Sequence, residues 1–320
     1  MRPTRFIFQL SLTCVLYLAA AVASGQDYPV KPIRVVTASA GGGSDFVARQ
    51  VAQGISGPLG QPVIVDNRGS GVLPGEFAAK APPDGYTLLI NGGSTWLLPL
   101  LQSSPYDGVR DFSPISIISR NVNVFVVHPS VPAHSIKELI ALAKAKPGQL
   151  NYSLSSIGGG GHLAAELFKA MAGVNIVSVG YKGASPAVTG VIVGEVQLTV
   201  ADAGLVKPHT KSGKLRALAV TSAEPTALAP ELPTMAASGL PGYDAIGVTG
   251  VLAPSKTSPL IINRLNQEVV RFLKSPDIKE RFLNAGEELV GSSTEQFAAK
   301  IASDMTKTSK LIKDLGIKVN

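Results

Sequence analysis

Short runs of β-branched and aliphatic residues recur along the chain and are separated by glycine, proline and polar residues. Several runs are continuously apolar instead of alternating with polar residues, a pattern typical of strands that are buried on both faces. We predict eight strands, within the segments IRVVTA from residue 33, PVIVDN from 62, YTLLIN from 86, NVFVVH from 123, LNYSLS from 150, NIVSVGY from 175, VQLTVAD from 196 and LRALAVT from 215.

Helical patterns fill most intervals between these strands. Ser44 is the expected N-cap of one helix, and Gly57 followed by Pro58 is its expected end. Ser135 with Glu138 predicts a capping box at the start of another helix. Apolar residues at helical spacing define one face in each of three helices: Val47, Val51 and Ile55; Leu163, Leu167 and Met171; and, after Pro259 in a first turn, Leu260, Leu265, Val269 and Leu273.

Strands that alternate with helices predict an α/β fold with largely parallel sheets. The chain has 320 residues, of which 45% are hydrophobic, and this is enough for one or two substantial cores. No repeat of fixed period is visible in the sequence. Two lobes are therefore compatible with the length, and the proline-rich passage 224–241 is a candidate for a surface excursion or a crossing between them.

The first 25 residues have the organisation of a secretory signal peptide. A start with two arginines precedes a mostly apolar stretch from Phe6 to Val22, and small residues follow at the expected cleavage positions. A retained membrane span fits less well, because the stretch contains polar residues. A lipoprotein signal also fits less well, because Thr13 stands before Cys14 where a small alanine or glycine would be expected. We expect cleavage near residues 23–25, which removes the only cysteine and leaves an exported chain without disulfides.

Charge and histidine placement exclude two further classes of function. The formal net charge of +7 comes from lysines and arginines that are scattered with acids between them, which argues against a nucleic-acid-binding stripe. A diffuse positive field modestly favours anionic small molecules, and a solvated basic surface without such a role is the alternative. His128, His134 and His209 lack the spacing of metal ligands, so we predict no metal site.

Two glycine-rich loops each connect a predicted strand to a predicted helix: SAGGGSD at 39–45 and SLSSIGGGGHL at 153–163. Such a loop brings several backbone N–H groups to one point, where the helix dipole also favours negative charge. Two loops facing each other would form a cleft that holds a carboxylate from both ends, while simple turn geometry is the alternative for either loop alone. Neither loop has the third glycine of a dinucleotide fingerprint and no P-loop motif occurs, so we expect no nucleotide cofactor.

Further motifs follow in a characteristic order: LGQPVIVDNRGSG, AKAPPDGYTLL, PYDGVRDFSPIS, GGGGHLAAELF, VGYKGASPAV, KLRALAVTS and GVLAP. Together with GGGSDFVARQVA they cover essentially the whole chain after the signal peptide. In this order they resemble the Bug-type extracytoplasmic solute receptors, which are the TctC family of substrate-binding proteins of tripartite tricarboxylate transporters.

The resemblance implies an α/β, two-lobed fold like that of type II periplasmic binding proteins, with a central cleft. Lobe 1 is expected to contain residues 26–125 and 250–320, and lobe 2 residues 126–249. The resemblance also implies a periplasmic receptor, without enzymatic activity or cofactor. Such a receptor captures a small organic, usually carboxylated solute and presents it to the membrane permease subunits of the transporter.

Carried onto this sequence, the ligand contacts of the family fall on the two glycine loops and on two neighbouring turns. The expected contacts from the first loop are Ala38, Ser39, Gly41, Gly42, Gly43, Ser44 and Asp45. Those from the second loop are Ser155, Ser156, Gly158, Gly160 and His162. Ser94, in the turn 91–95, and Asp202, at the end of VQLTVAD, are also expected to face the cleft.

Structural roles compete with ligand binding at most of these positions. The serines suit turns and helix caps as well as ligands. His162 packs equally well beside Glu166, one turn along its helix, and Asp45 can stabilise its own helix start instead of meeting a ligand hydroxyl or amine. Trp96 fits either the cleft wall or an ordinary core, and Lys182 is a candidate cation.

The first loop departs from the family pattern. Relatives usually have PFPPGG, two further residues and an aspartate there, whereas this chain has TASAGGGSD, ending at Asp45. Ala38 in place of the usual phenylalanine leaves more room, and the missing prolines make the loop less preorganised. We therefore predict a pocket of altered shape, so the small aliphatic dicarboxylates bound by relatives are not directly expected to be its ligands.

Two other functions remain open from the sequence. An exported hydrolase or transferase acting on a small carboxylated molecule needs a nucleophile and a base within reach, and the sequence has no GxSxG elbow. A receptor that serves a membrane sensor instead of a permease has the same sequence features. Loss of uptake or loss of induction in a deletion strain distinguishes transport from sensing.

Overall fold

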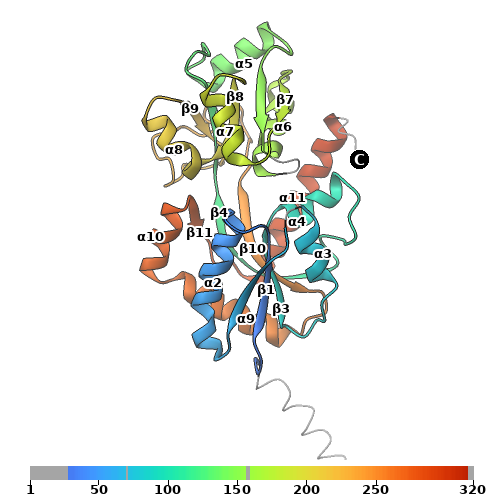
Figure 1. Cartoon of the computed structure of the whole chain (residues 1–320). Helices are drawn as coiled ribbons and strands as arrows, with labels where there is room; N and C mark the ends of the chain where they lie inside the picture. Colours follow the sequence, from blue (N-terminus) through green and yellow to red (C-terminus); the bar gives the residue numbers. More distant parts are fainter. Residues whose placement is uncertain (1–27, 70, 156–158, 316–320) are drawn as a thin grey trace, which may run out of the picture.

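The computed structural model describes residues 28–69, 71–155 and 159–315. The expected signal peptide, residues 1–25, and two expected ligand contacts, Ser156 and Gly158, lie outside this part of the chain. The described residues form two β-sheets, which lie one above the other in Figure 1, each with helices packed against it. The prediction of an α/β fold is confirmed.

The first sheet combines strands from both ends of the chain, in the order β11-β4-β10-β3-β1-β2. Its strands are β1 (Ile33–Thr37), β2 (Val63–Asn67), β3 (Thr87–Gly92), β4 (Phe112–Asn121), β10 (Gly247–Pro254) and β11 (Glu287–Leu289). β1, β2 and β3 are parallel, whereas β10 runs antiparallel to β3 and β4. β11 adds an antiparallel edge to β4.

The second sheet is formed entirely by the middle of the chain, in the order β7-β6-β8-β5-β9. Its strands are β5 (Asn123–Val127), β6 (Asn151–Leu154), β7 (Val177–Gly180), β8 (Leu198–Asp202) and β9 (Arg216–Val220). β6 is parallel to β7 and β8, and β5 is antiparallel to β8 and β9. Within the described residues, β10 and β11 oppose the other four strands of the first sheet, and β5 opposes the other four strands of the second.

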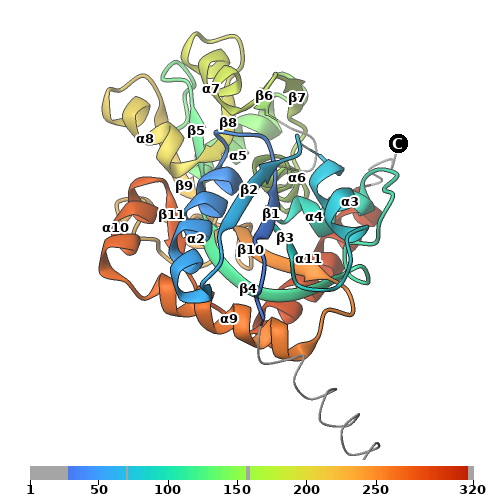
Figure 2. The same ribbon diagram turned by 60° about the horizontal axis from the view of Figure 1, so that its bottom comes forward.

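Helices cover both faces of the first sheet (Figure 2). One face carries α2 (Gly43–Leu59), α9 (Pro259–Leu273) and α10 (Pro276–Asn284). The other carries α3 (Leu73–Ala79), α4 (Ser94–Leu97), the 3-10 turn η1 (Leu98–Leu100) and α11 (Thr294–Leu315). In the first of these two cores, Val51 of α2 and Leu265 of α9 pack with Val35 of β1, because their apolar faces repeat at helical spacing.

The second sheet is covered in the same way. α5 (Ile136–Ala145) and α6 (Gly160–Ala172) pack on one face, and α7 (Ala184–Ile192) and α8 (Ala203–Lys211) on the other. Along β5, Phe125 and Val127 join the first core while Val124 and Val126 join the second. This explains the continuous apolar run NVFVVH, since both faces of that strand are buried.

The chain crosses between the sheets at two places. Val122 alone separates β4 from β5, and the return path from β9 to β10 runs through residues 221–246. The two crossings are tied together by backbone hydrogen bonds, because the Thr221 N–H donates to the Asn123 carbonyl and the Ala245 N–H donates to the Thr221 carbonyl, each at 2.9 Å. The expected lobe boundaries at residues 125 and 250 fall inside β5 and β10.

All eight predicted strands are present, and three strands were not predicted. β4 reads FSPISIISRN, in which serine and proline interrupt the apolar pattern, and β10 reads GVTGVLAP, with a glycine in its middle. β11 has only three residues. These three segments form strands because they pair with neighbouring strands, and not because their own residues have a high β-strand propensity.

The predicted ends of the first helix are wrong. α2 begins at Gly43, with Gly42 in an extended conformation as N-cap, so Ser44 lies in the first turn and does not cap the helix. At the other end α2 continues through Pro58, because a proline in the last turn removes only one backbone hydrogen bond. Gly60, with φ at 67°, then ends the helix in the left-handed conformation.

Two other helix starts are confirmed. The Ser135 hydroxyl accepts a hydrogen bond from the Glu138 N–H at 3.2 Å, and Pro259 is the first residue of α9. Leu260, which was grouped with the buried face of that helix, is instead 69% exposed. Leu260 lies in the first turn of α9, where no preceding helical turn helps to define the buried face, so the spacing of apolar residues predicts its burial poorly.

Replacing Gly54 with alanine tests the contact between α2 and α9. A Cβ at Gly54 would overlap the ring of Phe272, including the ring atom nearest the backbone, so rotation of the ring alone cannot clear it. We expect Gly54→Ala to lower the free energy of unfolding by ~1–3 kcal/mol in a denaturant titration. Gly57→Ala is the control, because nothing lies within 4 Å of a Cβ there and alanine favours a helix; equal stability of the two variants would contradict the close packing.

Candidate functional site

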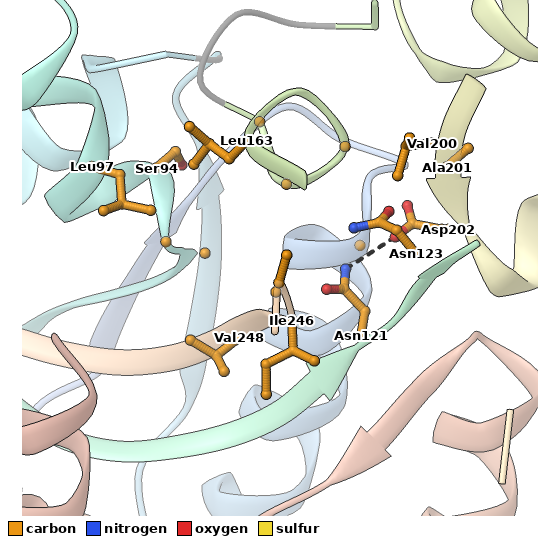
Figure 3. Close-up of a pocket in the computed structure, with 18 of the residues that line it drawn as sticks. Ser94, Leu97, Asn121, Asn123, Leu163, Val200, Ala201, Asp202, Ile246 and Val248 are labelled. Atoms are coloured by element: carbon orange, nitrogen blue, oxygen red, sulfur yellow. Dashed lines mark hydrogen bonds between the residues drawn. The ribbon is translucent and has the colours of Figure 1, made fainter. Parts of the chain in front are cut away.

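A pocket of about 960 Å³ lies between the two sheets. The first lobe lines it with the start of α2, the β3–α4 turn and the inner face of α11, and the second lobe with the start of α6 and the end of β8. The crossing segments contribute Asn121, Asn123 and the stretch 245–249 to its floor. Figure 3 shows side chains from both lobes pointing toward the same space.

The start of α2 offers backbone donors to this pocket. Gly42 is the N-cap, and no side chain caps the helix. The next two residues, Gly43 and Ser44, line the pocket. Because the first N–H groups of a helix have no partners within it, this end of α2 can donate hydrogen bonds to an anion.

Asp45 is engaged by its own lobe and does not line the pocket. Its carboxylate accepts hydrogen bonds from the Gly41 N–H at 2.9 Å and from Asn67 Nδ2 at 2.9 Å, and pairs with Arg49 at 3.0 Å. Burial by itself would raise the pKa of Asp45, but these partners outweigh it and lower the pKa. Of the two roles considered for Asp45, the geometry favours stabilisation of its own loop and helix start.

The start of α6 faces the pocket from the second lobe. Gly159 is the N-cap in an extended conformation without a side-chain cap, and Gly160 and Gly161 line the pocket. A Cβ at Gly161 would overlap the Val200 carbonyl of β8, so only glycine allows this close approach. His162 is half-buried, and burial lowers its pKa, so the ring is neutral near pH 7.

One wall of the pocket is apolar. Leu163, Leu167 and Met171 share a face of α6, as predicted, but that face borders the pocket. The core face of the same helix consists of Ala164, Ala165, Phe168 and Ala172. Helical spacing defines both rows equally well, so the sequence could not tell which row is buried.

The floor of the pocket carries two acids from different lobes. Glu287 of β11 is 4% exposed, and its Oε2 accepts a hydrogen bond from the Ser119 hydroxyl at 2.7 Å. Burial raises the pKa of Glu287 to about 7, opposed by Ser119 and reinforced by the negative charge of Asp202. Asp202 accepts from Asn121 Nδ2 at 3.2 Å and is exposed toward the pocket, yet both lobes surround it and this desolvation raises its pKa.

The side of the pocket formed by α11 is basic. Lys300, Lys307 and Lys310 line it, and Lys300 pairs with Asp304 at 2.6 Å. Asp304 also lies 3.3 Å from Nε1 of Trp96. Trp96 is fully buried and packs edge-on against Phe297, so of its two expected places the core is the one observed.

Within the described residues, the expected contacts divide into two groups. Those that line the pocket are Gly43, Ser44, Ser94, Ser155, Gly160 and Asp202. Those that lie on the same loops without lining it are Ala38, Ser39, Gly41, Gly42, Asp45 and His162. Direct ligand contact stays a prediction for all of these residues. The larger pocket expected from alanine at position 38 also stays a prediction; in the structure the Ala38 carbonyl accepts a hydrogen bond from Asn67.

Several pocket residues were missed from the sequence. Asn121 and Asn123 lie in the crossing between the lobes, Glu287 lies on the unpredicted strand β11, and the lysines lie on α11. Only Asn123 had a local signal, as the first residue of the apolar run NVFVVH. Glu287 and the lysines reach the pocket only through the packing of the C-terminal segment onto the first lobe, and Asn121 reaches it as the last residue of the unpredicted strand β4.

The described residues contain no group of three or more histidine, cysteine or acidic side chains placed to hold a metal ion. Among the helices of residues 28–315 that the structure describes, none is long and apolar enough to span a membrane.

Comparison with solved structures defines the class of protein. The chain superposes on the periplasmic binding protein BugD with a TM-score of 0.77, covering 91% of this chain and 99% of that chain at 29% identity. It superposes on R. palustris Rpa4515 with adipate with a TM-score of 0.80, covering 90% of this chain and 98% of that chain at 33% identity. Two lobes with a pocket between them are thus the fold of a periplasmic solute-binding protein.

Sequence comparison identifies the family. The model of the tripartite tricarboxylate transporter family receptor, TctC, matches residues 47–317. Protein BugT of Bordetella pertussis is 34% identical over 325 aligned residues that cover 100% of both chains. The chain belongs to the TctC family of solute-binding receptors, as its motifs had suggested.

Glu287 makes the stability of the unliganded protein depend on pH. Because its pKa rises from 4.5 to about 7 on folding, the folded state binds more protons between these values and stability falls as the pH rises through them. We expect Glu287→Gln to stabilise the protein by up to about 3 kcal/mol above pH 7, with no gain below the unfolded pKa. Thermal unfolding across this pH range measures the difference.

The adjacent acid supplies the control. Glu288 accepts hydrogen bonds from Thr226 at 2.5 Å and from Arg120 at 2.7 Å, and although burial opposes them, these partners lower its pKa. Glu288→Gln should therefore destabilise the protein at neutral pH, the opposite of the Glu287 variant. The same sign of change in both variants would contradict the assignment.

Proposed function

We propose that this receptor binds a small organic acid between its lobes and delivers it to the membrane permease subunits of a tripartite tricarboxylate-type transporter. The observation that carries the proposal is the meeting of two helix N-termini without side-chain caps, those of α2 and α6, at one pocket. The unpaired N–H groups and partial positive charge of each end favour a carboxylate.

A relative supports this class of ligand. Rpa4515, at 33% identity, is known in complex with adipate, a dicarboxylate. A pocket of about 960 Å³ lies near the upper end of the ~300–1,000 Å³ typical of small-molecule sites. The apolar wall formed by Leu163, Leu167 and Met171 suits a carbon skeleton between polar groups.

Binding is coupled to closure of the two lobes in this proposal. We place the hinge at Val122 and at the segment 221–246, where the chain crosses between the sheets. A solute that contacts both α2 and α6 interacts with both lobes only when they are close together. It therefore shifts the equilibrium toward the closed form, which the permease recognises.

Export through a cleavable signal peptide at residues 1–25 would bring the receptor to the periplasm, in agreement with the description of its relative BugD as periplasmic. The TctC family consists of receptors, and no arrangement of a nucleophile and a base in the described pocket favours the alternative hydrolase. A signalling partner instead of a permease would leave the binding step unchanged.

A charge placed at the start of α2 tests the anion site. Ser44→Asp adds a carboxylate in the first turn, where it favours the helix dipole but repels a bound carboxylate. We expect calorimetry with adipate and shorter dicarboxylates to show at least roughly tenfold weaker binding, with no loss of thermal stability in the absence of ligand.

Ser44→Asn is the matched control, because asparagine has the same shape as aspartate without the charge. It should bind within a few-fold of the parent protein. Equal affinities of the two variants would mean that the start of α2 does not hold the carboxylate, and conversion of any acid during the titration would instead favour an enzyme.

A further inference from the structure

The floor of the pocket contains polar groups that the proposed carboxylate site does not use. We name Asn123, Asp202 and Glu287 the acidic subsite. Asn123 comes from the start of β5, Asp202 from the end of β8 and Glu287 from β11, so both lobes contribute. Figure 3 shows Asn123 and Asp202 close together at one end of the pocket, beside Asn121.

Asn123 has unused hydrogen-bonding capacity although it is buried. The residue is 4% exposed and its side chain lines the pocket. Its backbone bonds to Thr221, but within the described residues its side-chain nitrogen donates no hydrogen bond. Because this side chain faces the pocket, its amide can form a hydrogen bond with a ligand there.

The two acids are equally short of partners. Within the described part of the chain, the Glu287 carboxylate accepts one hydrogen bond, at Oε2 from Ser119, and the Asp202 carboxylate accepts one, from Asn121. Among the described residues neither acid forms an ion pair, in contrast to Glu288 and Asp45, which pair with Arg120 and Arg49. The free Oε1 of Glu287 lies 3.5 Å from the position of a Cβ on Gly43, at the mouth of the anion site of α2.

This arrangement is unfavourable for a second carboxylate. A carboxylate beside Glu287 and Asp202 would meet two acids and no compensating cation, because the lysines that line the pocket all lie on α11. A cationic hydrogen-bond donor in the same place would satisfy Glu287, Asp202 and the oxygen of Asn123 together.

We propose that the acidic subsite binds an ammonium group of the solute, so that the ligand of this receptor is an amino-substituted carboxylic acid, and that Glu287 determines this specificity. The inference rests on the proposed function, since the carboxylate is taken to lie at the helix N-termini. Because Glu287 adjoins Gly43, the amino group and one carboxylate of the solute are close neighbours in its structure.

The test compares acids that share one carbon skeleton. Succinate and aspartate form one set, and adipate, 2-aminoadipate and 2-hydroxyadipate form another. Calorimetry is done on the exported chain, at a pH above the pKa of Glu287 of about 7, so that the carboxylate is ionised. We expect at least one amino acid to bind roughly tenfold or more tightly than its unsubstituted partner.

Variants assign the preference to Glu287. Glu287→Gln keeps the shape and the acceptor for Ser119, and should remove the preference by weakening the amino acid while binding the plain dicarboxylate as tightly as before, or more tightly. Glu195→Gln is the matched control, because that acid bonds to Tyr181 away from the pocket and should leave the preference unchanged.

The outcomes separate this inference from the proposed function. Binding of plain dicarboxylates without preference for the amino acids, or a preference that Glu287→Gln leaves intact, would overturn the ammonium subsite alone. If the hydroxy acid binds as tightly as the amino acid, the subsite recognises a hydroxyl group as well as an ammonium group, and the proposed specificity for an amino group is wrong. Failure of every acid to bind the parent protein would overturn both proposals.

Discussion

Each helix that opens toward the pocket begins where a parallel strand ends, and this property of the βα unit positions the backbone donors of the site. α2 follows β1, α6 follows β6 and α8 follows β8. In each sheet the carboxyl ends of these strands point toward the other sheet, so the helix starts collect between the lobes. The absence of a side chain at Gly161 then lets β8 approach the start of α6 closely.

The sequence predicted this arrangement well where a local signal exists. The runs of apolar residues found every parallel strand, and the two glycine loops led to the starts of α2 and α6. β4 and β10 were not predicted, because their mixed composition gives no strand signal and it is their pairing with each other, with β3 and with β11 that forms them. The predicted start and end of α2 are wrong, because Gly42 and Gly60 cap the helix as well as the predicted residues could.

The floor of the pocket could not be predicted in the same way. Glu287 and Glu288 are neighbours of the same type, yet one has its pKa raised and the other lowered. Burial acts more strongly on Glu287, which also feels the negative charge of Asp202, whereas Thr226, Arg120 and the Ala227 N–H reach only Glu288. Such partners come from distant segments, and no spacing along the chain reveals them.

The crossing between the lobes bears on how a solute would leave the proposed site. In the closure proposed above, the lobes rotate about the two crossings, because Val122 alone links β4 to β5 and backbone hydrogen bonds tie this link to the return path. The widest opening is then at the rim farthest from the crossings, while Asn123 on the floor moves least. The residence time of a solute is therefore expected to depend on the rate at which the lobes rotate open. Solutes of quite different affinity would then leave by the same opening motion.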